Sequence, residues 1–173
     1  MKLRTFLYIL LCSILLTGCS GIQVRSVTEN FSIDREGRYV VFPFADPPGD
    51  RFTNTSGKGE HFRERFARYC LKKGVNIEPI YGSQLTAEES IDLEDAIEIA
   101  KRKGANHIVL GRVTKWPSGE QTVAGLQVTI TGVYSRKVVF SAEASKNSEA
   151  YSYSNNEDLV NDISREMAER ACR

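Results

Sequence analysis

Apolar residues recur along this chain at two spacings, which separate helical segments from strands. Three segments repeat apolar residues every three or four positions, the period of one helix face; these segments are 60–73, 93–103 and 157–171. Five other segments are short apolar runs or alternate apolar with polar residues, as strands do; these are 38–44, 76–81, 106–113, 126–131 and 138–142. The order is therefore strand, helix, strand, helix, three strands and a last helix.

This order predicts an α/β fold. In the first half, strands alternate with helices, which favours parallel pairing with crossover connections. The later strands follow one another directly and predict an antiparallel meander. We therefore expect a single mixed sheet, parallel in its first half and antiparallel in its second, covered by about three helices. This single domain is expected over 38–173, after a tether over 19–37 in which Ile22, Val24 and Val27 could also form an edge strand.

Local signals support the first two helices. Asp92 can cap the helix over 93–103, and Gly104 can end it after a run of basic residues. The helix over 60–73 carries one apolar stripe, made of Phe62, Phe66, Tyr69 and Cys70. Its basic residues are expected on the rest of its surface; they are Arg63, Arg65, Arg68 and Lys72.

The N-terminal segment has the pattern of a bacterial lipoprotein signal. A basic head is followed by an apolar run over 6–16, which is too short for a membrane-spanning helix of about 20 residues. The run ends in the lipobox Leu16-Thr17-Gly18-Cys19. We expect removal of residues 1–18 and a diacylglycerol thioether on Cys19, usually with a third acyl chain, which together anchor the chain to a membrane.

The residue after the lipidated cysteine bears on which membrane holds the chain. In Gram-negative envelopes, Asp at this position commonly retains a lipoprotein in the inner membrane, and here the residue is Ser20. Such sorting signals are read by receptors and are not anchors themselves. We therefore expect an outer-membrane lipoprotein on the periplasmic face.

Two cysteines remain beyond the signal and the anchor. Cys70 and Cys172 lie late in predicted helices, in a chain expected in an oxidising compartment. They are either a disulfide pair or two separately buried thiols. Pairing requires the helices over 60–73 and 157–171 to lie side by side with their C-terminal ends together, because bonded cysteines need Cα atoms within about 7 Å.

Charge and motif chemistry point away from several functions. The chain has 23 Lys and Arg residues against 22 Asp and Glu, which does not resemble a nucleic-acid binder. The two histidines, His61 and His107, have no Cys, His or carboxylate at metal-ligand spacing. We find no catalytic constellation and expect no enzyme activity, no cofactor and no metal. Asp46 and Asp50 flank a turn and are interpreted as turn residues rather than as a catalytic or metal pair.

A few loop residues are candidates for binding. Trp116, Tyr151 and Tyr153 lie in predicted loops, where aromatic residues often mark contact surfaces; for Trp116 the alternative is packing at the edge of the core. The turn over 56–59 precedes a helix but lacks the spacing of a phosphate-binding loop. We interpret it as a flexible turn whose backbone N–H groups could still receive an anion.

Two motifs resemble known envelope proteins. They are Val40-Val41-Phe42-Pro43-Phe44-Ala45-Asp46 and the pattern A-x-x-I-A-x-x-x-G-A-x-x-I-V-L-G over 96–111. They resemble the TolB N-terminal domain, the lipoproteins that activate penicillin-binding proteins, and the curli secretion lipoprotein CsgG. Residues 54–57, Trp116 and 127–145 are more similar to an uncharacterised family of Gram-negative outer-membrane lipoproteins. The resemblance implies an α/β fold that binds partner proteins or assembles, and it supplies no catalytic residues.

These observations lead to a functional expectation with one main alternative. We expect a lipid-anchored, non-enzymatic module that binds a periplasmic protein or assembles. The alternative is a lipoprotein that binds a small ligand, such as a peptidoglycan fragment or a glycan, near the loop over 46–59. A hydrolase with an unrecognised site is the third hypothesis.

Overall fold

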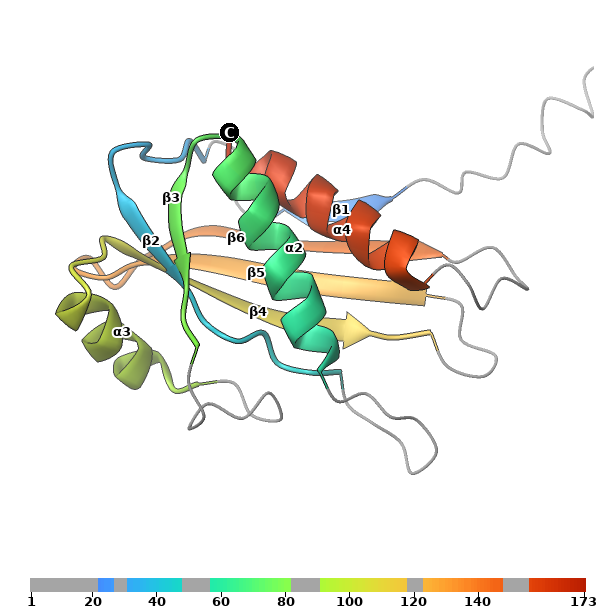
Figure 1. Cartoon of the computed structure of the whole chain (residues 1–173), viewed down its shortest axis with the longest axis horizontal. Helices are drawn as coiled ribbons and strands as arrows, with labels where there is room; N and C mark the ends of the chain where they lie inside the picture. Colours follow the sequence, from blue (N-terminus) through green and yellow to red (C-terminus); the bar gives the residue numbers. More distant parts are fainter. Residues whose placement is uncertain (1–21, 27–30, 48–56, 82–90, 118–122, 148–155) are drawn as a thin grey trace, which may run out of the picture.

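The apolar strands pair into one mixed sheet in the order β1-β6-β5-β4-β2-β3 (Figure 1). The computed structural model describes residues 22–26, 31–47, 57–81, 91–117, 123–147 and 156–173. The strands are β1 (Gln23–Ser26), β2 (Arg38–Val41), β3 (Asn76–Pro79), β4 (His107–Lys115), β5 (Val123–Gly132) and β6 (Val138–Asn147). The helices are α2 (Lys58–Lys72), α3 (Leu93–Arg102) and α4 (Asn156–Ala171).

The pairing directions confirm the predicted fold class. Strand β2 pairs in parallel with both β3 and β4, whereas β4, β5 and β6 pair antiparallel in chain order. The α3 helix also forms as its local signals predict, because the Asp92 carboxylate accepts a hydrogen bond from the Glu94 N–H at 2.8 Å. Gly104 follows this helix with φ +66°, a conformation that favours glycine.

The expected tether contains part of the folded domain. Residues 23–26 form β1, which pairs antiparallel with 142–145 of β6 at the edge of the sheet. Ile33 is buried in the core, and its N–H donates to the Arg173 carbonyl at 3.3 Å. The folded domain therefore begins before residue 38. Pairing with β6 and the hydrogen bond to Arg173 hold this N-terminal segment against the rest of the domain.

The helices cover opposite faces of the sheet. α2 and α4 lie side by side on one face, and α3 lies against the other face near β2 and β4 (Figure 1). Neighbouring β2 residues divide between two cores, since Val41 faces α2 and α4 while Val40 packs with α3. The last helix thus shares its sheet face with α2.

A disulfide joins the ends of the two neighbouring helices. Cys70 lies in the last turn of α2 and Cys172 directly follows α4, and the structure bonds them with their Cα atoms 5.5 Å apart. The C-terminal ends of both helices lie together in Figure 1. This is the side-by-side arrangement that the pairing requires.

Candidate functional site

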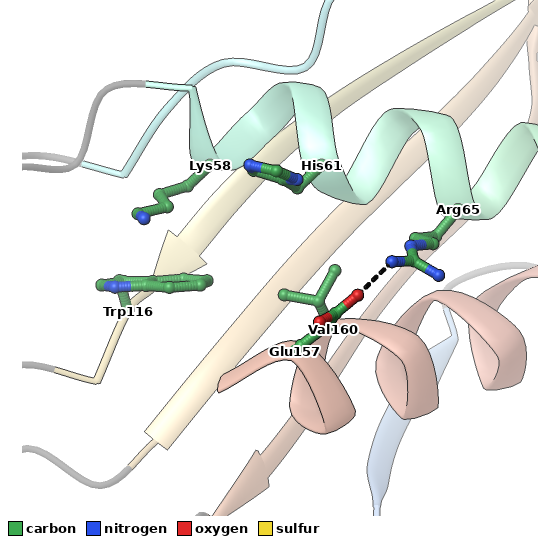
Figure 2. A pocket seen from close by; sticks show the side chains of 6 residues that line it. All are labelled: Lys58, His61, Arg65, Trp116, Glu157 and Val160. Carbon is green, nitrogen blue, oxygen red and sulfur yellow. Dashed lines mark hydrogen bonds and ion pairs between the residues drawn. The ribbon is translucent and has the colours of Figure 1, made fainter. Parts of the chain in front are cut away.

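A surface cleft of about 280 Å³ lies where three separate segments meet. The first two turns of α2 form one side, the start of α4 forms another, and the residue after β4 closes the end (Figure 2). Its lining residues are Lys58, His61, Arg65, Trp116, Glu157 and Val160. Only one of them, Trp116, is among the sequence-predicted site residues.

The Asp46 carboxylate fixes the N-terminus of α2. It accepts hydrogen bonds from the Gly57 N–H at 2.8 Å and the Gly59 N–H at 2.6 Å, while Gly57 itself supplies no side-chain cap. The backbone N–H groups that could receive an anion are therefore occupied by a carboxylate of the chain itself. Asp46 acts as a remote helix cap, and Asp50 lies outside the described residues.

Trp116 combines the two interpretations made from the sequence. Its partly buried ring packs at the edge of the core, where it meets Phe62 nearly at right angles with ring centroids 6.2 Å apart. The ring also lines the cleft, and the Lys58 Nζ atom lies 4.9 Å from its centroid. Trp116 therefore lines the cleft with its aromatic ring, and its packing against Phe62 holds the ring in position. Tyr151 and Tyr153 lie outside the described residues, as does Cys19.

Basic side chains dominate the electrostatics of the cleft. Lys58, His61 and Arg65 come from one stripe of α2 and lie along the same side of the cleft (Figure 2). Arg65 forms an ion pair with Glu157, which is 73% exposed. In the described part of the chain, the Lys58 ammonium and the His61 ring make no ion pair.

The expectation that Arg63 lies on the surface is wrong. Its side chain is only 1% exposed, donates from Nη1 to the Ile80 carbonyl at 2.6 Å, and pairs with Glu60. The guanidinium also lies 4.6 Å from the ring centroid of Tyr81. These contacts tie α2 to the end of β3. The sequence offers no local signal for this burial, because the Ile80 carbonyl that accepts from Arg63 lies 17 residues further along the chain.

The second histidine lies away from the cleft. His107 begins β4, and its ring stacks on Tyr39 with centroids 4.6 Å apart and an interplanar angle of 10°. Burial lowers the pKa of His107 below its usual value, and the negative charge of Asp34 opposes this only in part. Within the described residues, no group of three or more His, Cys, Asp or Glu side chains could hold a metal ion. His107 thus has the environment of a structural histidine.

The domain is expected to lose stability as the pH falls below about 6.5. The lowered pKa of folded His107 means that the unfolded chain binds more protons between the two pKa values. Stability should therefore fall as the pH drops through 6.5 toward the folded pKa. Thermal melts at pH 7.5 and 5.5 test this: His107→Gln should weaken the pH dependence, and His61→Gln, which removes an exposed histidine, should retain it. Equal pH dependence in wild type and His107→Gln would contradict the prediction.

Solved structures of other proteins share the fold of this chain. A dodecamer of PelC from Paraburkholderia phytofirmans aligns with a TM-score of 0.62 and 17% identity, over 83% of this chain and 94% of PelC. The lipoprotein GNA1162 from Neisseria meningitidis aligns with a TM-score of 0.50 and 14% identity, over 77% of this chain and 99% of that one. Because GNA1162 is a lipoprotein, the resemblance to lipoproteins is confirmed at the level of the fold.

Comparison of sequences matches a smaller part of the chain than comparison of structures does. No protein-family model matches the chain. Among curated proteins, trans-1,2-dihydrobenzene-1,2-diol dehydrogenase from Sus scrofa is 33% identical over 67 residues, which cover 39% of this chain. The chain spans about a fifth of the length of this curated relative (19%). None of the helices in the described residues has both the length and the apolar character needed to cross a membrane.

Proposed function

We propose that this chain is a lipid-anchored envelope lipoprotein whose α/β domain binds a protein partner or assembles, without catalysing a reaction. The lipid on Cys19 would hold the domain at the periplasmic face of the outer membrane. One coincidence carries the proposal: a complete lipobox, Leu16-Thr17-Gly18-Cys19, precedes a fold that a solved lipoprotein shares over 99% of its length. The dodecameric state of PelC supports assembly as one form that the binding could take.

The chemistry of the cleft supports binding rather than catalysis. Its lining consists of basic and apolar side chains and one carboxylate, and these six residues include no Ser, Thr or Cys nucleophile. The sequence also contains no Gly-x-Gly-x-x-Gly fingerprint of a dinucleotide-binding fold. The short match to a dehydrogenase therefore adds no support for an enzyme of that class.

Crosslinking in intact envelopes tests the proposed function. A photoreactive amino acid is placed at exposed positions of the lipidated full chain, one position at a time, and adducts are identified by mass spectrometry. A specific adduct with another envelope protein, or with a second copy of this chain, is expected. The absence of any protein adduct from every surface position would overturn the proposal. Turnover in a broad hydrolase screen that is lost in Asp46→Asn would contradict its non-enzymatic part.

The alternative is a lipoprotein that binds a small ligand such as a peptidoglycan fragment or a glycan. Trp116 favours this alternative, because an aromatic wall in a surface cleft is a common feature of ligand sites. The same crosslinking experiment separates the two functions. Co-purification of muropeptides, without a protein adduct, would favour the ligand-binding lipoprotein.

Replacement of the proposed anchor residue should release the protein from the membrane. Cys19→Ala removes the thiol that would be acylated, so the precursor should stay uncut or the product should become soluble. Labelled palmitate should enter the wild type and the control Cys12→Ala, whose change lies in the expected signal peptide. Palmitate in Cys19→Ala would contradict lipidation at this site. Sucrose-gradient recovery of the wild type with inner membranes would contradict outer-membrane sorting.

A further inference from the structure

Two basic side chains of α2, Lys58 and Arg65, line the cleft (Figure 2). Lys58 lies in the first turn of the helix, where the helix dipole disfavours a cation. Glu60 in the same turn and Lys72 in the last turn follow the usual rule, so Lys58 is the exception in this helix. Helix stability therefore does not explain the position of Lys58, whose ammonium group lies over the Trp116 ring at the cleft.

The hydrogen-bonding inventory of the cleft restricts its ligand. Lys58 and Arg65 are donors only, His61 adds one ring donor and at most one ring acceptor, and Glu157, the one carboxylate in the lining, is paired with Arg65. A neutral sugar presents many hydroxyl groups, which need acceptors as well as donors. A carboxylate accepts only, so it matches Lys58 and Arg65 without needing further acceptors.

The apolar side chains of the cleft indicate that its ligand carries an apolar group beside the carboxylate. Val160 and the Trp116 ring lie across from the basic stripe, and Phe62 supports the ring from the core. The Lys58 ammonium lies over the Trp116 ring, so a group that packs on this ring also lies beside a cation. A volume of about 280 Å³ suits one or two side chains rather than a large ligand.

We infer that the cleft binds an acidic peptide segment of the protein partner, with a carboxylate on Lys58 and Arg65 and a neighbouring apolar side chain against Trp116 and Val160. This inference rests on the proposed partner-binding function and adds the chemistry of the partner. The positive charge of the cleft is complementary to such a segment. Binding should weaken with added salt, because these side chains are in contact with solvent.

Trp116 offers a direct measurement, because it is the only tryptophan in the chain. The full chain in detergent is titrated with the peptide acetyl-Ala-Asp-Phe-Glu-Ala-amide and with the matched peptide acetyl-Ala-Asn-Phe-Gln-Ala-amide, up to about 1 mM. The acidic peptide should shift Trp116 fluorescence saturably and bind at least about tenfold more tightly than the amide peptide. Equal binding of the two peptides, or no binding of either, would overturn the inference.

Charge-removing variants locate the peptide. Lys58→Gln and Arg65→Gln should each weaken the acidic peptide about tenfold, whereas Arg68→Gln removes an exposed arginine of the same helix outside the cleft and should leave binding unchanged. An equal loss of peptide affinity in all three variants would contradict binding of the peptide in the cleft. Tighter binding of a neutral N-acetylglucosamine tetramer than of the acidic peptide would also overturn it. A protein adduct in envelopes that maps to a segment without acidic residues would overturn this inference and leave the proposed function standing.

Discussion

Reduction of the bond between Cys70 and Cys172 is expected to lower the free energy of unfolding by about 4–5 kcal/mol. The two cysteines are 102 residues apart in sequence, so the bond closes most of the domain into one loop. In the chain-entropy model, a crosslink of this length strongly restricts the unfolded chain and thereby stabilises the folded state. For a domain of this size, the melting temperature should fall by about 10–20 °C.

A double variant provides the matched control. Both cysteines are buried, so Cys70→Ala with Cys172→Ala removes the bond without introducing a buried hydroxyl group. Reductant should lower the melting temperature of the wild type and leave that of the double variant unchanged. Mass spectrometry of the exported protein without reductant should find no free thiol at either position. Two free thiols, or a wild type that is insensitive to reductant, would contradict the prediction.

The helices and the central strands could be predicted because their signals are local. Asp92 lies two residues from the N–H group that it caps, and Gly104 follows the Lys103 C-cap of α3, so a short stretch of sequence contains the whole motif. The apolar stripe of α2 likewise predicts which face is buried. The mixed sheet followed from the order of these elements, since alternating strands and helices favour parallel pairs.

The missed features depend on residues far apart in the sequence. The sequence offers β1 only as a possible edge strand within the tether, because the edge of β6 that it pairs with lies far along the chain. Asp46 caps amides that lie 11 and 13 residues further along the chain. Arg63 is buried because the Ile80 carbonyl at the end of β3 accepts its hydrogen bond, and a helical pattern alone assigns an arginine to the surface.

The candidate site was predictable only in part for the same reason. Trp116 could be chosen as an aromatic residue in a loop, but the sequence assigns Lys58 to a flexible turn and Arg65 to an exposed helix face. Only the packing of α2 against α4 brings Arg65 to Glu157 and places the start of α2 opposite Val160. A binding site built from three segments therefore requires the tertiary structure.

Gly59→Ala is expected to destabilise the domain by about 3 kcal/mol, although alanine is the better helix former. An ideal Cβ at this position would lie 2.0 Å from the Phe44 carbonyl oxygen. The Phe44 backbone cannot easily withdraw, because the N–H groups of Phe42 and Ala45 donate to carbonyls of β4 on either side of it. The N-terminal end of α2 must therefore move outward, which pulls Phe62 away from Trp116 and breaks the hydrogen bond from the Gly59 N–H to Asp46.

The predicted change in stability is opposite in sign to the change that helix propensity alone would give, so the measurement separates the two effects. Helix propensity alone would make Gly59→Ala stabilising by about 1 kcal/mol, so a lower stability in urea denaturation identifies the close approach of α2 to the Phe44 backbone. Trp116 fluorescence should change in the same variant, because the ring loses its contact with Phe62. Glu64→Ala, an exposed change in the same helix, should alter stability by no more than about 0.5 kcal/mol. Unchanged or raised stability of Gly59→Ala would mean that the Phe44 carbonyl can move away, and that α2 is not held against the segment after β2 as the structure describes.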